Sequence, residues 1–319
     1  MKTRVKKNTC FLIVPCFNEE EIIEKSISKL TKKIKILIKN KKISNDSKII
    51  LVNDGSTDNT WDIISKISLS NPFLIALKFS KNFGHQNAVL AGLEFSVDKC
   101  DYTISIDADL QQDINAIDRF IDKFNEGNDL VYGIRNSRNT DSFFKKITSQ
   151  LFYKLMIKMV GGDTIILNHA DYRLVSNKVL NILKYYKEHD IFLRGLFPSM
   201  GFKHDFVYFD VFDRSAGSSK YTFKKMFNLA LNGITSFSIF PLELILIVGF
   251  LLLMISVGMI ISFAFFNNSF ILYFGAMLFS ASIIILCMGI IGLYLGKIHL
   301  ELKGRPRYIV ETTITGKNR

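Results

Sequence analysis

Short apolar runs alternate with helical patterns through the first 135 residues, and this alternation decides the fold class of the chain. The runs cover residues 10–15, 48–53, 74–79, 102–106 and 130–134. Each run has the length of a buried strand, and the segments between them carry the spacing of amphipathic helices. Strands that are joined through helices form crossover connections, so we predict an α/β fold with a mostly parallel sheet.

Polar residues follow three of these runs at the point where each predicted strand ends. They are Asn18–Glu19, Asp54–Ser56 and Asp107–Asp109. In a parallel sheet, ligands bind beyond the carboxyl ends of the strands, so the pattern predicts a nucleotide site there. Neither a Gly-x-Gly-x-x-Gly nor a Walker loop occurs, which disfavours a dinucleotide-dependent enzyme and a P-loop NTPase.

Asp107 and Asp109 form a carboxylate pair at the end of the fourth predicted strand, and Gln111 follows them. Because side chains alternate along a strand, we expect both carboxylates to project to the same side. Hard oxygen donors of this kind suit Mg²⁺ or Mn²⁺ that is held together with substrate phosphates. A solvated acidic turn is the alternative, and an Asp-x-Asp pattern alone does not exclude it.

Two long apolar runs, residues 240–266 and 270–296, are the other prominent feature of the chain. Their only charged residue is Glu243, near the start of the first run. A membrane span needs about 20 apolar residues, so we predict two transmembrane helices rather than a buried helix pair. Basic residues flank the outer ends, which places both flanks in the cytoplasm. The predicted units are a cytoplasmic domain (1–236), a hairpin in the cytoplasmic membrane (237–297) and a cytoplasmic tail (298–319).

The net charge of +12 fits either nucleic acid or anionic lipid and phosphate partners. The predicted hairpin favours the second, so we expect a lipid bilayer partner and no nucleic acid. Residues 142–160 and 221–237 have amphipathic patterns, which predict interfacial helices or core-packing helices. The four cysteines show neither metal-ligand spacing nor a disulfide pattern, in agreement with a reducing compartment.

Taken together, the motifs resemble those of inverting family-two glycosyltransferases of GT-A (Rossmann-like) fold. The ordered motifs are VPCFNEE (14–20), VNDGS (52–56), NFGHQ (82–86), DADLQ (107–111) and RSAGSSKY (214–221). With the predicted hairpin, they are similar to the polyprenyl-phosphate glycosyltransferases, which include bactoprenol glucosyltransferases and dolichyl-phosphate mannose synthases. Processive polysaccharide synthases carry a Gln-x-x-Arg-Trp motif, which is absent because the single tryptophan is Trp61.

The resemblance implies a donor site and a metal site. It implies that the nucleotide sugar contacts Pro15, Phe17, Glu19, Asp54, Asp107 and Ala108. It further implies that Asp107, Asp109 and Gln111 hold Mg²⁺ or Mn²⁺. Two departures from the family pattern occur, since Phe17 replaces a common tyrosine and Gln112 stands where prolines are frequent.

The resemblance also implies a catalytic site for an acceptor phosphate. It gives Asp171 a catalytic role near the acceptor. Arg214 and Lys220 lie in a Gly-Ser loop that can close over phosphates, so we assign them to acceptor-phosphate binding and to catalysis. Arg135 and Arg138, after the fifth predicted strand, are further candidates for acceptor-phosphate binding. Asp171 would act as orienting group or base, or would merely cap a turn, and Arg173 could pair with it. Arg214 and Lys220 could instead be positive charges that flank the membrane. We expect His85 and His169 to have structural or hydrogen-bonding roles.

The implied activity is the inverting transfer of a sugar from a nucleotide sugar to polyprenyl (undecaprenyl) phosphate at the cytoplasmic membrane. The resemblance favours UDP-glucose or a related UDP-hexose. The alternatives are a GDP-mannose-dependent mannose synthase and an inactive membrane scaffold. A phosphate acceptor is already mostly ionised at neutral pH, so it has little need of a strong general base.

The tail contains a run of β-branched residues from Tyr308 to Ile314, which predicts a strand. It could add to the sheet of its own domain or to that of a neighbouring subunit. The resemblance favours exchange between subunits in a homo-oligomer of four. The alternative is a frayed basic tail.

Overall fold

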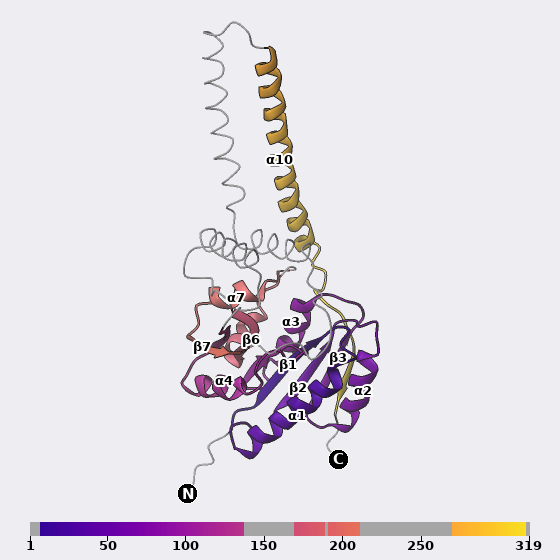
Figure 1. Cartoon of the computed structure of the whole chain (residues 1–319), viewed down its shortest axis with the longest axis vertical. Helices are drawn as coiled ribbons and strands as arrows, with labels where there is room; N and C mark the ends of the chain where they lie inside the picture. Colours follow the sequence, from indigo (N-terminus) through magenta and orange to yellow (C-terminus); the bar gives the residue numbers. More distant parts are fainter. Residues whose placement is uncertain (1–6, 137–168, 189–190, 211–269, 317–319) are drawn as a thin grey trace.

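The structure is a computed structural model that describes residues 7–136, 169–188, 191–210 and 270–316 (Figure 1). Its strands are β1 (Cys10–Cys16), β2 (Lys48–Asn53), β3 (Leu74–Phe79), β4 (Tyr102–Ser105), β5 (Leu130–Arg135), β6 (His169–Ser176), β7 (His204–Phe209) and β8 (Val310–Thr315). Its helices are α1 (Ile23–Lys39), α2 (Thr60–Ser70), α3 (His85–Ser96), α4 (Ala116–Asn125), α6 (Asn177–Leu183), α7 (Leu193–Ser199) and α10 (Phe270–Leu302). All five predicted strands of the first 135 residues are confirmed.

The described strands form one sheet in the order β7-β5-β6-β4-β1-β2-β3-β8. Strands β1 to β4 pair in parallel, and β5 pairs in parallel with β7. Strand β6 lies antiparallel between β4 and β5, and β8 is antiparallel to β3. The carboxyl ends of β1 to β5 therefore lie at one edge of the sheet, which we call the carboxyl edge.

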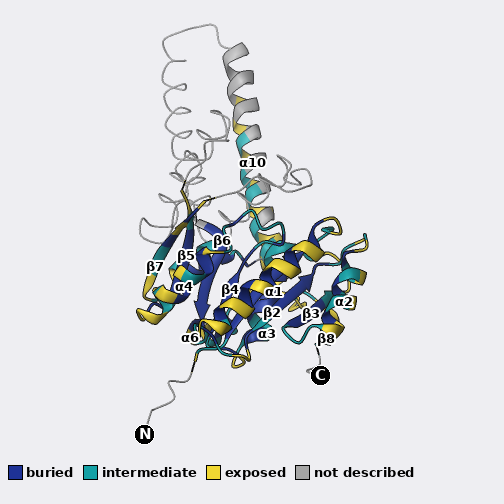
Figure 2. Cartoon of the chain, turned by 60° about the horizontal axis from the view of Figure 1, so that its bottom comes forward, coloured by how far each residue is buried: buried dark blue, intermediate teal, exposed yellow. Residues whose placement is uncertain are grey.

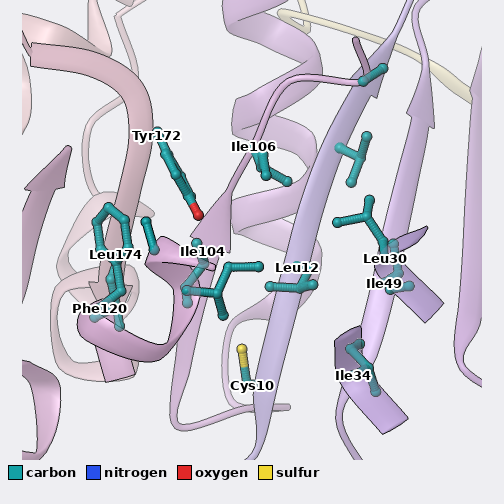
Figure 3. Close-up of a cluster of buried hydrophobic side chains, with 14 of the residues drawn as sticks. Cys10, Leu12, Leu30, Ile34, Ile49, Ile104, Ile106, Phe120, Tyr172 and Leu174 are labelled. Carbon is teal, nitrogen blue, oxygen red and sulfur yellow. The ribbon is translucent and has the colours of Figure 1, made fainter. Parts of the chain in front are cut away.

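Both faces of the sheet are covered by helices, which explains why its strands are continuously apolar. One face of β1 packs through Leu12 and Val14 against α1, α2 and α4 (Figure 3). The other face packs through Phe11 and Ile13 against α3, α6 and α7. Figure 2 shows buried strands between helices whose outer faces are exposed. At Gly92 of α3, a Cβ atom would lie 2.4 Å from the Ile13 side chain, so a glycine lets this helix approach β1 closely.

The tail strand is confirmed, because β8 pairs antiparallel with β3 of its own chain. The residues before it are also docked. The guanidinium of Arg307 lies 2.5 Å from the carboxylate of Glu94 on α3, and the Tyr308 hydroxyl donates to the same carboxylate. The Tyr308 ring stacks on Phe79 at a centroid distance of 5.1 Å. A frayed tail is therefore wrong for residues 307–315, and exchange between subunits stays a prediction.

Replacing Tyr308 by alanine should lower the free energy of unfolding by about 1–3 kcal/mol, because the half-buried ring loses its stacking on Phe79 and its hydrogen bond to Glu94. The matched control is Tyr185→Ala, whose side chain is 74% exposed. The control should stay within about 0.5 kcal/mol of wild type. Thermal unfolding of the full chain measures both, and equal losses would show that the docking adds no stability.

Over the part of the chain that the structure describes, no helix is both long and apolar enough to cross a membrane. The first predicted span, residues 240–266, lies outside the described residues, as do the amphipathic segments 142–160 and 221–237. The second predicted span lies within α10, whose side chains are described only in part. The two-helix hairpin therefore stays a prediction.

Candidate active site

Loops at the carboxyl edge carry most of the predicted donor residues that the structure describes. The loop after β1 is tied to the loop after β2, since the Asn18 amide donates to the Ser56 hydroxyl at 3.0 Å and the Thr57 amide donates to Asn18 Oδ1 at 2.8 Å. Asn18 adopts a φ of 53°, a conformation that asparagine tolerates better than most residues. Phe17 and Glu19 flank it and are partly exposed, whereas Pro15 is buried inside β1.

Asp54 ties together the loops after β2 and β3. Its carboxylate is 2% exposed and accepts hydrogen bonds from the backbone amides of Phe83 at 2.7 Å and Gly84 at 3.0 Å. Burial raises the pKa of Asp54 to about 6 in spite of these bonds. Gly55 has a φ of 61°, and a Cβ atom there would lie 2.2 Å from the backbone of Lys81. Asp54 thus shapes the predicted nucleotide site through the backbone of the neighbouring loop.

The raised pKa of Asp54 predicts a pH dependence of stability. The ordinary pKa of this carboxyl is 3.8. Between that pH and about pH 6, the Asp54 carboxyl loses its proton in the unfolded chain and keeps it in the folded chain. The free energy of unfolding should therefore fall as the pH rises through this window, by roughly 3 kcal/mol at most. Urea unfolding at pH 4 and pH 6.5 should show this fall in wild type and a smaller one in Asp54→Asn. Asp46→Asn, at an exposed turn, is the control and should behave as wild type. The same change in the free energy of unfolding between pH 4 and pH 6.5 in all three proteins would contradict the prediction.

The carboxylates of Asp107 and Asp109 lie in the turn after β4. The strand ends at Ser105, so the expectation that strand alternation aligns them is wrong. The turn is anchored at Ala108 between them, which is buried and whose carbonyl accepts a 2.7 Å hydrogen bond from the Ser26 hydroxyl. Asp107 and Asp109 are both partly exposed, and their charges interact.

Gln112 holds Asp107 in place, and sequence reasoning did not assign it a role. Its side-chain amide donates to Asp107 Oδ2 at 2.6 Å, and its carbonyl oxygen accepts from the Asp107 backbone amide at 3.0 Å. Gln111 contacts Asp109 through its backbone amide, at 3.2 Å. The sequence did contain an indication of this role, because Gln112 stands where prolines are frequent in the family. A buried glutamine, unlike a proline, needs hydrogen-bond partners for its side chain.

The Asp107 and Asp109 carboxylates fit a divalent cation by their chemistry. Burial raises the pKa of Asp107, and the charges of Asp171 and Asp109 raise it further against the lowering effect of His85. The ionised pair is therefore electrostatically unfavourable as it stands, and a bound cation would relieve this repulsion. Two hard oxygen donors at a partly exposed turn are what Mg²⁺ or Mn²⁺ prefers.

Asp171 on β6 is buried and contacts basic side chains from three elements. Arg173 on the same strand donates to its Oδ1, which confirms the pairing that the sequence left open. Arg194 on α7 donates to both carboxylate oxygens, at 3.1 and 2.6 Å. His85 Nε2 at the start of α3 lies 3.6 Å from Oδ2. We call these four residues the Asp171 cluster.

The pairing in the Asp171 cluster makes Asp171 a poor base. Burial by itself raises the pKa of this carboxyl, but the charges of Arg194, His85 and Arg173 hold it well below its usual range. A carboxylate with so low a proton affinity does not take a proton readily at neutral pH. Of the three roles that the sequence left open, the geometry favours orientation over a base, and the place of Asp171 within β6 argues against a turn cap.

His85 links the Asp171 cluster to the turn that carries Asp107 and Asp109. Its Nε2 lies 3.9 Å from Asp107 Oδ1 as well as 3.6 Å from Asp171 Oδ2. Loss of solvent contact lowers the pKa of His85, but Asp171 and Asp107 raise it above its ordinary value of 6.5. The sequence predicted a hydrogen-bonding role and not this position between two carboxylates. It gave no signal for Arg194, which lies 23 residues from Asp171 in the chain.

The predicted acceptor-phosphate residues are only partly described. Arg135 is exposed at the end of β5, at the same carboxyl edge. Arg138, Arg214 and Lys220 lie outside the described residues. His169 begins β6, where it pairs in register with Ile134.

Comparison with known proteins identifies the family. The sequence model of glycosyl transferase family 2 matches residues 11–183. The uncharacterized glycosyltransferase YkoT of Bacillus subtilis (strain 168) is 43% identical, over 94% of this chain and 90% of that protein. The bactoprenol glucosyl transferase of Shigella phage SfX is 37% identical over 94% and 98%, and an Escherichia coli (strain K12) prophage homologue is 36% identical over 94% and 97%. The chain therefore belongs to glycosyltransferase family 2, and its mostly parallel α/β sheet is the GT-A fold of that family.

Proposed function

We propose that this glycosyltransferase moves a sugar from a nucleotide sugar to a polyprenyl phosphate. The observation that carries the proposal is the Asp107–Asp109 turn beside the cationic Asp171 cluster at one edge of the sheet. Support also comes from the relatives named bactoprenol glucosyl transferase, which match this chain over nearly their full length. UDP-glucose is the proposed donor, and GDP-mannose is the alternative.

The donor would lie along the loops after β1, β2 and β4. Phe17 offers a partly exposed ring for the base, and Glu19 lies beside it. Asp107 and Asp109 would hold Mg²⁺ or Mn²⁺, with Gln111 as a further oxygen ligand. The cation, when bound, supplies charge neutralisation to the departing diphosphate. Gln112 holds the Asp107 carboxylate, and the Ala108 carbonyl anchors the turn through Ser26.

The acceptor's phosphate oxygen would attack the anomeric carbon from the face opposite the leaving group, which inverts the configuration there. The phosphate is already ionised, so no residue has to remove a proton. This agrees with Asp171, which is committed to its cationic partners. The main obstacle is then repulsion between two anions, which positive charges of the site reduce. Arg135, Arg138, Arg214 and Lys220 are proposed for this task.

A polyprenyl acceptor places the reaction at a membrane, and we propose that it takes place at the cytoplasmic face of the cytoplasmic membrane. The predicted hairpin would anchor the protein there. We propose that the protein assembles as a homo-oligomer. Large apolar side chains on α10 support contact with an apolar environment. Met277 is 74% exposed, Met288 is 68% exposed and Leu295 is 60% exposed. Exposed apolar surface of this kind marks contact with a membrane or with another protein.

A panel of radiolabelled sugar nucleotides, supplied to membranes that contain the protein and undecaprenyl phosphate, tests the proposal. We expect labelled sugar in the lipid extract with UDP-glucose, and none when undecaprenol replaces its phosphate. Label from GDP-mannose alone would support the mannose synthase. Absence of lipid-linked sugar, together with no donor-dependent release of nucleoside diphosphate, would support the inactive scaffold.

A further inference from the structure

The segment that joins α10 to β8 contacts two elements that lead into the candidate active site. After α10 ends at Leu302, the chain passes α3 and joins the sheet as β8, beside β3 (Figure 1). Strand β3 and helix α3 are themselves joined by residues 80–84, which we call the β3–α3 loop. The tail therefore meets the elements at both ends of this loop.

Glu94 is the anchor of the tail on α3. Arg307 donates to one of its carboxylate oxygens at 2.5 Å, and the Tyr308 hydroxyl donates to the other. Arg307 also donates to the Tyr186 carbonyl at 3.1 Å, and its side chain is 10% exposed, so the guanidinium is held on two sides. Helix α3 begins at His85 and runs unbroken past Glu94. The anchor therefore holds the same rigid helix that carries His85.

Phe79 at the end of β3 is the second contact of the tail. The Tyr308 ring stacks on the buried Phe79 ring at 5.1 Å, and Phe79 meets the Phe83 ring edge-on at 5.7 Å. Both arrangements are favourable for aromatic pairs. In addition, the Ser80 amide donates to the Ile309 carbonyl at 3.1 Å. The tail thus binds the first residue of the β3–α3 loop directly and reaches Phe83 through one intervening ring.

The far end of the β3–α3 loop belongs to the candidate active site. The amides of Phe83 and Gly84 hold the buried Asp54 carboxylate, at 2.7 and 3.0 Å. Phe83 and His85 also line a cavity of about 220 Å³ that Asp171 borders. Residues 80–82 of the loop are exposed. A segment with few buried contacts opens easily, so its conformation depends on the contacts at its two ends.

We propose that the docked tail positions the donor site, because Tyr308 acts through Phe79 to hold the β3–α3 loop where Phe83 and Gly84 bind Asp54. Tyr308 is a positioning residue, since its contacts are with Glu94 and Phe79 and not with the loops that would hold the donor. The inference rests on the proposed function for the identity of the donor. It makes the donor site complete only while the segment after α10 is docked.

Two measurements on the full-length protein test the role of Tyr308. Tyr308→Ala should raise the Kd for UDP-glucose, measured with Mg²⁺ and without acceptor, by about tenfold, because the donor must then order the loop itself. Without any ligand, hydrogen–deuterium exchange of residues 80–86 should be faster in this variant. Tyr308→Phe keeps the stacked ring and loses only the hydroxyl, so both readouts should stay within about twofold of wild type.

Ile314→Ala is the matched control for stability. Ile314 lies in the same tail strand, but it pairs with Ala76 inside β3 and packs on the opposite face of the sheet from Phe79. Its truncation should lower the free energy of unfolding as Tyr308→Ala does, without touching the β3–α3 loop. At a temperature where every variant is folded, donor binding and the exchange of residues 80–86 should remain those of wild type.

The outcomes separate this inference from the proposed function. Unchanged exchange in Tyr308→Ala, or faster exchange with an unchanged Kd for UDP-glucose, overturns the inference. Equal effects of Ile314→Ala overturn it as well, because Tyr308 then contributes stability alone. If wild type does not bind UDP-glucose, the proposed donor fails and GDP-mannose replaces it in the measurement. If neither binds, exchange decides: faster exchange in Tyr308→Ala alone upholds the positioning, and any other pattern overturns it. Should Tyr308→Ala fail to fold, Tyr308→Leu answers the same questions, since it keeps apolar volume without a ring.

Discussion

Replacing Asp109 by alanine should abolish nearly all sugar transfer while the fold stays intact. Asp109 lies in a partly exposed turn, so its loss costs little packing. It removes one of the two carboxylates that we assign to the cation, and the loss of a comparable charge-stabilising group costs about 100- to 1,000-fold in rate. Transfer of radiolabelled sugar to undecaprenyl phosphate, with Mg²⁺ or Mn²⁺ and with excess chelator, measures the effect.

The chain offers a matched control for this variant. Asp113 accepts from the amide of Asn115 two residues on, as Asp109 does from the amide of Gln111. Asp113→Ala should therefore disturb the local turn in the same way without touching the cation site, and it should keep most of the activity. Full turnover by Asp109→Ala, or by wild type in excess EDTA, would refute the assignment of a metal to this turn.

Replacing Asp171 by alanine should destabilise the folded chain by about 3–5 kcal/mol, because it leaves the fully buried guanidinium of Arg173 without a counter-charge. Asp171→Asn should cost less, since the amide oxygen still accepts a hydrogen bond. Urea or thermal unfolding near pH 7 measures the loss, because the lowered pKa keeps Asp171 ionised there. The stabilisation by ionised Asp171 is fully present above the pKa that this carboxyl has in the unfolded chain. It is lost only as the pH falls through the lower pKa of Asp171 in the folded chain.

An exposed ion pair provides the comparison for Asp171. Asp205 is 35% exposed and pairs with Lys123 at 2.9 Å. Surface pairs of this type contribute about 0–1 kcal/mol, so Asp205→Ala should be nearly neutral. Equal effects of Asp171→Ala and Asp205→Ala would show that Arg173 finds another partner or water. A stable Asp171→Ala protein with full activity would also exclude the orienting role.

The sequence by itself determined the first five strands, the tail strand and the edge at which the first strands present polar groups. Apolar runs such as residues 48–53 predict strands locally, because burial on both faces requires nearly every side chain to be apolar. The order of strands and helices then places Asp54 and Asp107 at one edge, because parallel strands end on the same side. Four of the five family motifs, VPCFNEE, VNDGS, NFGHQ and DADLQ, likewise consist of neighbouring residues at or just after a strand end.

Only the tertiary structure decided which charges meet. Strand β6 inserts between β4 and β5, although its polar residues Asp171 and Arg173 give it no apolar run. That insertion brings Asp171 against His85 of α3 and Arg194 of α7, so a carboxylate that local sequence could read as a base is held by two guanidinium groups and an imidazole. The pairing of β8 with β3 likewise joins residues more than 200 positions apart in sequence. Pattern and propensity describe neighbours along the chain, whereas the proton affinity of Asp171 depends on neighbours in space.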